Sequence, residues 1–519
     1  MSVKTRRQGA IAYVELNNAP VNAMGLALRQ GLLNAVNWVE NESGIERVIL
    51  SGAGRVFAAG GDAKEFDASP IEPHLPDVLN RIENCEIPWI AAAHGAALGG
   101  GLELMLSCRV RIAAPKTQLG LPEVTLGVIP GAGGTQRLPR LVGLETAVDM
   151  ISSGKPVTAD QALTLGFIDL VDPDPVNAAE TLPTEYLDTA VAVGHRDCPA
   201  MNQSALDAAR ATSFKKQKHQ IAPQKAIDLV ELSAHSQLVD GLKAERACFV
   251  DLRNTSQAKA LRHMFFAERA NRQPRHITCD PVDISTVAVV GGGTMGAGIT
   301  YALLNAGLSV VLLETDNEGV DRARINIDKI IQASLDRGLI SAEKEQKIHG
   351  CLTISTDYNA ARHANLAIEA AFESMDVKKS IFQSLEAVLP SSAVLATNTS
   401  YLDVNEIAKA IKDTSRVVGL HFFAPAHIMK LLEIVKGHTT SDQAIATGFA
   451  MAKTLGKIPV LAGVCDGFIG NRILQRYREA ADGLLLDGTN PWELDEAMEA
   501  FGYAMGPYEA QDLSGLDIA

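Results

Sequence analysis

Two glutamates near glycine-rich turns could move protons beside a carbonyl group. Glu103 lies in the turn HGAALGGGLELML (94–106), and Glu123 follows in LGLPEVTLG, shortly before the glycine cluster PGAGGTQR (130–137). An earlier turn, VFAAGGDAKEF (56–66), also stands between a strand-like run and a helical pattern, so the two turns could direct two backbone N–H groups at one oxyanion. Two carboxylates beside such a site can transfer protons at carbons next to a carbonyl. A structural interpretation stays open, because glycines also permit close packing and an acidic residue stabilises the first turn of a helix.

A further glycine-rich turn, in STVAVVGGGTMGAGITYALLNAGLSVVLLETD (285–316), predicts a dinucleotide site. An apolar strand leads into the turn, a helix follows, and a second apolar strand ends at an acidic residue 18 positions past the last glycine of the motif. Such glycines permit the tight turn, the approach of the pyrophosphate and close helix–strand packing, and the acidic residue binds the ribose hydroxyls. No arginine follows directly to bind a 2′-phosphate, so NAD is expected rather than NADP. The expected cofactor residues are Gly291, Gly293, Met295, Gly296 and Glu314.

His421 is the candidate base for the oxidation of an alcohol. It lies in GLHFFAPAHIMKLLEIV (419–435), and Glu433 follows twelve residues later. A histidine titrates near neutral pH, and a carboxylate can fix its tautomer and stabilise the imidazolium. The chain has twelve histidines, so a structural role for this one stays open on the pattern alone.

The first set of motifs resembles the enoyl-CoA hydratase/isomerase (crotonase) family over about residues 8–185. The matching blocks, in the family's order, are FAAGGDAKEF, HGAALGGGLEL, LGLPEV and IPGAGGTQRLPRLVG. The resemblance implies that the amides of Gly61 and Gly100 form an oxyanion hole. It also implies that Glu103 acts on the water added at the β carbon of a 2-enoyl-CoA thioester, and Glu123 on the proton at the α carbon. Relatives that convert 3-enoyl to 2-enoyl thioesters rely mainly on the Glu123 position, so an isomerase side activity is implied as well.

The second set resembles the 3-hydroxyacyl-CoA dehydrogenase family from about residue 285 to the end. The blocks are IEAAFESMDVKK (368–379), LATNTSYL (395–402), GLHFFAPAHIMKLLEIV (419–435) and CDGFIGNRIL (465–474). The resemblance implies His421 as the catalytic base and Glu433 as its partner. The remaining implied contacts are to the substrate, by Ser400 and Asn471, and to the cofactor, by Glu373 and Lys378.

Hydratase first and dehydrogenase second is the order of the multifunctional β-oxidation enzymes of peroxisomal type, which the chain resembles over nearly its whole length. This resemblance implies an enzyme that hydrates a 2-enoyl-CoA and then oxidises the 3-hydroxyacyl-CoA with NAD to a 3-ketoacyl-CoA. Two alternatives stay open. One is an isomerase and dehydrogenase with weak hydration, and the other is a non-catalytic scaffold that binds acyl-CoA.

Four segments must position these residues, and together they predict an α/β chain. Residues 1–185 alternate strand-like and helical patterns, which agrees with a crotonase-like core. Residues 186–284 predict a helical extension that ends in a linker with two prolines. A Rossmann-type NAD-binding domain is expected over 285–465, and the start of an all-helical C-terminal domain over 466–519. Because the sequence ends inside that last block, we expect a truncated dehydrogenase half that binds NAD but turns over poorly.

The composition is that of a globular protein with an acidic surface. Of the 519 residues, 47% are hydrophobic and 21% are charged, and the formal net charge is −14. This charge argues against nucleic acid as a partner. The seven cysteines form no CxxC pair and no Cys/His cluster, so the sequence predicts no metal site and a reducing compartment.

One uncharged stretch, residues 284–313, is long enough for a membrane span but contains six glycines. We expect it to form a strand, a turn, a helix and a strand instead. The N-terminus lacks the apolar core of a signal peptide. The expected compartment is a bacterial cytoplasm, or a peroxisome in a eukaryote, and the sequence leaves the oligomeric state open, a monomer included.

Overall fold

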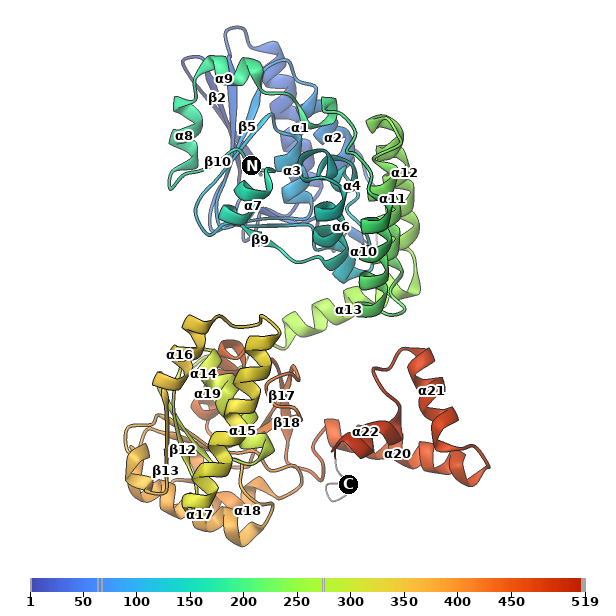
Figure 1. The fold of residues 1–519 in the computed structure, drawn as a ribbon. Coiled ribbons are helices and arrows are strands. Elements are labelled where there is room, and N and C mark those ends of the chain that lie inside the picture. Colours follow the sequence, from blue (N-terminus) through green and yellow to red (C-terminus); the bar gives the residue numbers. More distant parts are fainter. Residues whose placement is uncertain (1, 63–64, 67–68, 273, 275, 515–519) are drawn as a thin grey trace. The chain divides into compact units, whose positions relative to one another are not determined.

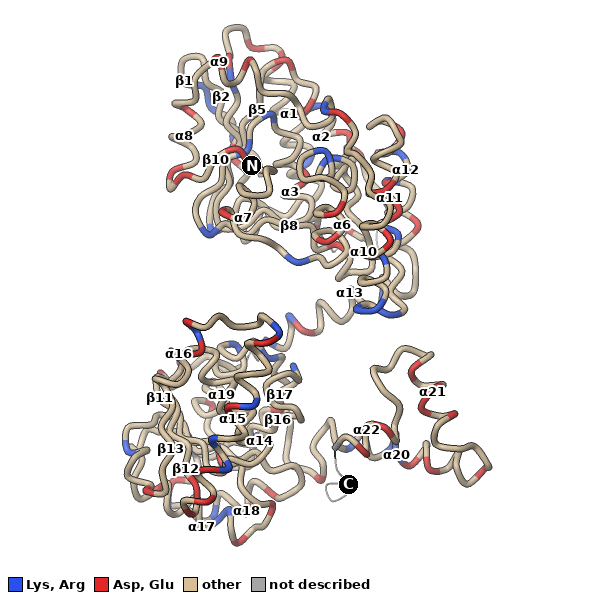
Figure 2. The backbone as a smooth tube through the Cα atoms, viewed as in Figure 1, with Lys and Arg blue, Asp and Glu red and all other residues tan. Residues whose placement is uncertain are grey.

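The fold is described from a computed structural model (Figure 1). The residues that the structure describes are 2–62, 65–66, 69–272, 274 and 276–514. The chain divides into two compact units, Met1–Phe265 and Phe266–Ala519. Figure 2 shows acidic and basic residues interspersed along the backbone of both units. Within the described residues, no helix has the length and apolar character to cross a membrane.

The first unit contains two sheets. Its strands are β1 (Val3–Gln8), β2 (Ile11–Leu16), β3 (Arg47–Gly52), β4 (Ala58–Ala59), β5 (Trp89–Ala93), β6 (Ala96–Leu98), β7 (Val110–Ala113), β8 (Gln118–Gly120), β9 (Val157–Thr158) and β10 (Leu170–Val171). One sheet has the order β1-β2-β3-β5-β7-β10 and is parallel except for β1 with β2. The other has the order β4-β6-β8-β9. Strand β5 is buried along its whole length, and its sequence WIAAA is accordingly a continuous apolar run.

Helices surround these sheets and continue into an extension. The helices of the strand-rich part are α1 (Leu26–Asn41), α2 (Leu75–Glu83), α3 (Gly100–Ser107), α4 (Gly134–Arg137), α5 (Pro139–Val142), α6 (Leu144–Ser153), α7 (Ala159–Leu165), α8 (Pro175–Thr181) and α9 (Thr184–Thr189), with the 3-10 turns η2 (Glu123–Leu126) and η3 (Val193–His195). The extension consists of α10 (Gln203–Lys216), α11 (Ile221–Leu232), α12 (Leu238–Arg253) and α13 (Ser256–Ala270). Its described residues contain no strand. Both α11 and α12 pack on α4, so the extension contacts the glycine cluster directly (Figure 1).

The second unit is a Rossmann-type domain followed by helices. Its strands are β11 (Thr286–Val290), β12 (Ser309–Leu313), β13 (Leu352–Ser355), β14 (Leu366–Glu369), β15 (Val394–Thr397), β16 (Val417–Phe422), β17 (Leu431–Lys436) and β18 (Ile458–Gly463). They form one sheet of order β13-β12-β11-β14-β15-β16-β17-β18, in which only β16 and β17 pair antiparallel. The uncharged stretch 284–313 forms β11, a helix and β12, so the prediction of alternating elements is confirmed.

The helices of the second unit follow the same alternation. Those around the sheet are α14 (Thr294–Asn305), α15 (Asn317–Asp336), α16 (Ala342–Gly350), α17 (Met375–Val388), α18 (Val404–Ala408) and α19 (Asp442–Thr454), with the 3-10 turns η4 (Tyr358–Ala361) and η5 (Thr414–Arg416). The C-terminal helices are α20 (Gly470–Leu486), α21 (Pro491–Phe501) and α22 (Pro507–Ser514). The predicted α/β architecture with a helical C-terminal segment is confirmed.

Candidate active sites

The first candidate site lies where the two glycine-rich turns meet at the N-terminus of α3. A Cβ atom added to Gly100 would lie 3.6 Å from the amide nitrogen of Gly61, so the two amides are neighbours. Gly99 has φ +54°, and a Cβ atom there would come within 3.3 Å of Cα of Gly60 and 2.7 Å of Oε1 of Glu123. Glycine alone tolerates this combination of left-handed backbone and close approach. Within the described part of the chain, neither Gly61 nor Gly100 donates its N–H to a protein acceptor.

The two predicted carboxylates of this site have different surroundings. Glu103, 3% exposed in the first turn of α3, accepts hydrogen bonds at Oε1 from N–H of Ala132 (2.7 Å) and Gly134 (2.9 Å). Burial raises the pKa of Glu103, and these two hydrogen bonds oppose that rise. The Oε2 atom of Glu123 is buried without a hydrogen-bond partner among the described residues. Burial raises the pKa of Glu123 well above its usual value, and the charge of Glu103 raises it further.

Three charged residues that the sequence analysis did not single out hold the glycine cluster in place. Arg137 and Glu83 form a fully buried ion pair of 2.7 Å, and Nη1 of Arg137 donates to the carbonyl oxygen of Ala132 at 2.9 Å. On the other side, Glu245 of α12 accepts a hydrogen bond from N–H of Gly133 at 2.5 Å. Arg137 belongs to the motif PGAGGTQR and was therefore accessible from the sequence, whereas no local pattern marks Glu245.

The second candidate site has the geometry of a dinucleotide-binding turn. The turn between β11 and α14, with the end of β12, brings together the predicted residues Gly291, Gly293, Met295, Gly296 and Glu314. Gly291 has φ +95°, and a Cβ atom on Gly296 would collide with its carbonyl oxygen. Nothing lies within 4 Å of a Cβ atom built on Gly293, which leaves room for a pyrophosphate. Oε1 of Glu314 accepts a hydrogen bond of 2.5 Å from N–H of Gly292, so its carboxylate is fixed beside the turn. These residues fit a dinucleotide.

His421 and Glu433 face each other across the antiparallel pair β16–β17. Nδ1 of His421 lies 2.7 Å from Oε2 of Glu433, and the two residues are only 3% and 1% exposed. The other carboxylate oxygen, Oε1, accepts hydrogen bonds from N–H of Ile469 (3.1 Å) and Gly470 (2.8 Å). Asn471 comes next in the chain, in the first turn of α20. The backbone directly before Asn471 is thus bound to the same carboxylate that pairs with His421.

Ser400, Glu373 and Lys378 form a connected network beyond the ends of β14 and β15. Oε1 of Glu373 accepts hydrogen bonds from the hydroxyl of Thr399 (2.5 Å) and from N–H of Ser400 (2.9 Å). Nζ of Lys378 lies 2.7 Å from Oε1 of Glu369 and 3.1 Å from Oε2 of Glu373, and the residue is 1% exposed. Burial raises the pKa of Glu373, but Lys378 and the hydrogen bonds outweigh burial and lower it. Lys378 therefore contacts two carboxylates inside the domain, a fact that its sequence position did not show.

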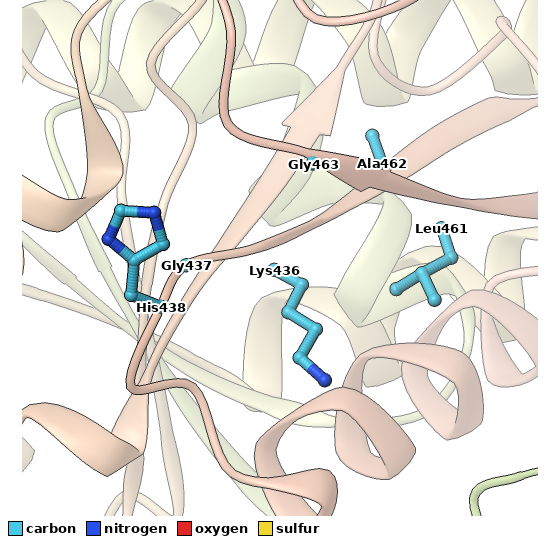
Figure 3. Close-up of a pocket in the computed structure, with 6 residues that line it drawn as sticks. All are labelled: Lys436, Gly437, His438, Leu461, Ala462 and Gly463. Carbon is cyan, nitrogen blue, oxygen red and sulfur yellow. The ribbon is translucent and has the colours of Figure 1, made fainter.

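A cavity of about 400 Å³ lies at the ends of β17 and β18 (Figure 3). Its lining residues are Lys436, Gly437, His438, Leu461, Ala462 and Gly463. None of them is a predicted site residue, and strand β17 is the element that the cavity shares with the His421–Glu433 pair.

Known families match the chain in three consecutive segments. They are "Enoyl-CoA hydratase/isomerase" over residues 6–184, "3-hydroxyacyl-CoA dehydrogenase, NAD binding domain" over 286–465 and "3-hydroxyacyl-CoA dehydrogenase, C-terminal domain" over 467–519. The segments coincide with the two sheets of the first unit, the sheet of the second unit and the C-terminal helices.

Several curated relatives are similar over the full length of the chain. The peroxisomal bifunctional enzyme of Cavia porcellus is 36% identical over 536 residues, which cover 100% of this chain and 73% of the relative. The enzyme of the same name from Homo sapiens is 37% identical, with 100% and 73% covered. The peroxisomal fatty acid beta-oxidation multifunctional protein of Oryza sativa subsp. japonica is 36% identical, with 98% and 73% covered.

Proposed function

Because the chain belongs to the family of multifunctional fatty acid β-oxidation enzymes, we propose that its two sites act in sequence on one acyl-CoA thioester. The chain is an enoyl-CoA hydratase and an NAD-dependent 3-hydroxyacyl-CoA dehydrogenase. The proposal assigns the residues. Glu103, Glu123, Gly61 and Gly100 carry out hydration, and His421 with Glu433 carries out oxidation.

Hydration needs one carboxylate as a base and one as an acid, and the surroundings of the two glutamates suit these roles. Glu103 accepts two backbone hydrogen bonds, which favour its ionised form, so it takes the proton of the attacking water. The water oxygen bonds to the β carbon. Glu123 is kept neutral by burial and by the nearby charge, so it gives its proton to the α carbon. The N–H groups of Gly61 and Gly100 stabilise the negative charge that develops on the thioester oxygen.

The observation that carries the hydratase assignment is a contrast between two carboxylates. Glu103 is held by two backbone N–H groups, whereas Oε2 of Glu123 has no hydrogen-bond partner in the described part of the chain. Isomerisation of a 3-enoyl thioester needs only one group that moves a proton, and the Glu123 position would suffice. The two backbone hydrogen bonds that hold the carboxylate of Glu103 therefore favour hydration as the main activity of this site, with isomerisation as a side activity.

In the dehydrogenase half, Glu433 orients the ring of His421 through the contact at Nδ1. With a carboxylate accepting at Nδ1, the proton of the neutral ring resides there, and Nε2 is free to take the proton of the substrate hydroxyl. NAD, when bound, supplies the acceptor for the hydride of the carbinol carbon. Ser400 and Asn471 hold the substrate oxygen in this proposal.

NAD is the cofactor, and we propose how this chain holds it. The turn containing Gly291, Gly293 and Gly296 receives the pyrophosphate, and the carboxylate of Glu314 binds the adenine ribose. Glu373 contacts the bound cofactor in this proposal. Lys378, whose Nζ is enclosed by carboxylates, acts through Glu373 by holding that residue ionised and in position.

An assay with crotonyl-CoA tests the proposed function. The absorbance of the enoyl thioester should fall without NAD as hydration occurs, and addition of NAD should produce NADH. Production of 2-enoyl-CoA from a 3-enoyl-CoA, with no loss of crotonyl-CoA absorbance, would instead identify an isomerase. A folded chain that binds acyl-CoA but catalyses neither step would be a scaffold, and the proposal would be wrong.

For a eukaryotic source we propose a peroxisomal location, because the relatives described above are named as peroxisomal enzymes. For a bacterial source we propose the cytoplasm. Fractionation of the native cells, with activity measured in each fraction, tests both cases.

A further inference from the structure

Glu245 is a buried carboxylate that lies outside the strand-rich part of the hydratase unit. It belongs to α12 of the helical extension and is only 1% exposed. Oε1 accepts a hydrogen bond from N–H of Gly133 (2.5 Å), and Oε2 accepts from both N–H (2.8 Å) and the hydroxyl (2.5 Å) of Thr135. Gln136 extends the chain of contacts, because its Nε2 donates to the Thr135 hydroxyl at 2.9 Å.

Successive amides of the glycine cluster alternate between two carboxylates. The N–H groups of Ala132 and Gly134 donate to Oε1 of Glu103, whereas those of Gly133 and Thr135 donate to Glu245. Four consecutive N–H groups are thereby satisfied by two side chains that come from α3 and α12. A shift of the cluster away from Glu245 would move the two amides that hold Glu103.

We propose that Glu245 is a positioning residue of the hydratase reaction. It clamps the cluster 132–135 from the side of α12, so that the alternate amides of the cluster hold the carboxylate of Glu103 at the substrate. The proposal rests on the proposed function, because it assigns Glu245 a role in the reaction of Glu103 and Glu123. It also gives the helical extension a part in catalysis.

The charge of Glu245 gives this role a second, electrostatic consequence. Burial, together with the charge of Glu103, raises the pKa of Glu245 to about 8. When Glu245 is ionised, its charge adds to that of Glu103 in raising the pKa of Glu123. The cations that act on Glu103 are Arg246 of α12 and Arg137 of α4, of which Arg137 is paired with Glu83 of α2.

The decisive variant is Glu245→Gln. An amide has one acceptor oxygen, so one of the two N–H groups from Gly133 and Thr135 faces an NH₂ group and loses its partner. We expect the kcat of hydration to fall roughly 10- to 100-fold, the cost of a small misplacement of a catalytic group. Above about pH 8, where Glu245 is ionised, the substitution also removes a negative charge and should lower the pKa of Glu123. The alkaline limb of the hydration pH profile should therefore move to lower pH, because Glu123 then loses its proton earlier.

Controls separate positioning from general loss of structure. Glu231→Gln makes the same chemical change in α11, where the side chain forms a surface ion pair with Arg210, and should leave hydration unchanged. Oxidation of supplied 3-hydroxybutyryl-CoA reports on the other half of the same chain and should stay unchanged in both variants. If Glu245→Gln fails to fold, Thr135→Val removes only the hydroxyl donor and should lower hydration, whereas Thr135→Ser should restore it.

The rate and the pH profile of the Glu245→Gln variant decide whether Glu245 is a positioning residue. An unchanged rate and an unchanged alkaline limb in a folded Glu245→Gln variant would overturn the proposal. So would an equal loss of hydration at every pH with an unmoved limb, because that reports only less folded enzyme. If the unaltered chain itself shows no hydration of crotonyl-CoA, the proposed function fails instead, before any variant is compared.

Discussion

Replacement of Glu433 by glutamine should reverse the tautomer of His421. The backbone N–H groups of Ile469 and Gly470 donate to one carboxylate oxygen, and Nδ1 of His421 faces the other. In Glu433→Gln the single amide oxygen is needed by the two backbone donors, so the NH₂ group must point at His421. Nδ1 then has to accept a hydrogen bond, and the ring proton moves to Nε2. The nitrogen that should take the substrate proton is blocked.

The size of this effect follows from what is lost. General base catalysis contributes roughly 10²–10⁴-fold, which is about 2.7–5.4 kcal/mol of activation free energy at 1.36 kcal/mol per factor of ten. Both side chains are almost fully buried, so little water can replace the lost partner. The backbone donors keep their acceptor, and the fold should therefore survive. In Glu433→Ala they lose it, which should cost roughly 0.5–1.5 kcal/mol for each lost hydrogen bond, because water can reach these partly exposed donors.

The assay is NADH production from 3-hydroxybutyryl-CoA, with hydration of crotonyl-CoA measured on the same preparation. Hydration should be unchanged, because its residues lie in the other unit. Glu343→Gln, in an exposed i,i+4 ion pair with Lys347, is the matched control and should leave both activities unchanged. Oxidation at the wild-type rate in folded Glu433→Gln would refute the assignment of His421 as a base oriented by Glu433.

Three further predictions concern other residues. Glu123→Gln should lower the rate of hydration roughly 10²–10⁴-fold and leave oxidation unchanged. Wild-type hydration should fall as the pH rises through the pKa of Glu123, which burial raises, because the acid then loses its proton. A stopped assay across pH measures both effects, and a hydration rate that stays constant at alkaline pH would contradict the acid role. NAD should be used with much higher kcat/KM than NADP, and Glu314→Ser with Thr315→Arg should narrow the gap; equal wild-type values would exclude this role for Glu314. Glu83→Ala removes the carboxylate that pairs with the buried guanidinium of Arg137 and should lower the free energy of unfolding by about 3–5 kcal/mol. Urea denaturation of the full chain measures this change, and an unchanged midpoint would show that the ion pair is dispensable.

The features that could be predicted from the sequence are those fixed by neighbours in the chain. The turn at Gly291 was predictable because a strand, glycines at set spacing and a helix lie within one segment of 285–316. The pairing of His421 with Glu433 was indicated by their spacing, since a chain reversal between them can place both on adjacent strands, as β16 and β17 do.

What escaped prediction depends on contacts between distant segments. Glu245 is 112 residues from Gly133, and it lies in an amphipathic helix where a glutamate is ordinarily a solvated side chain. The burial of Lys378 also depends on residues from other segments. Its family position suggested a role at the cofactor, but a lysine's burial is set by the acidic residues around it, here Glu369 and Glu373, and no single segment shows both.

The contact between Glu245 and the glycine cluster also bears on how such a chain can be assembled by recombination between genes. A crossover at the end of α9, the last helix of the strand-rich part, would pass on Glu103 and the cluster but leave α12 behind, and with it the acceptor for half of the cluster's amides. A crossover at the end of the first unit, near Phe265, would transmit the whole arrangement. The heritable module is therefore the strands together with the helical extension. Descendants that exchange a dehydrogenase partner would be expected to keep the extension with the hydratase.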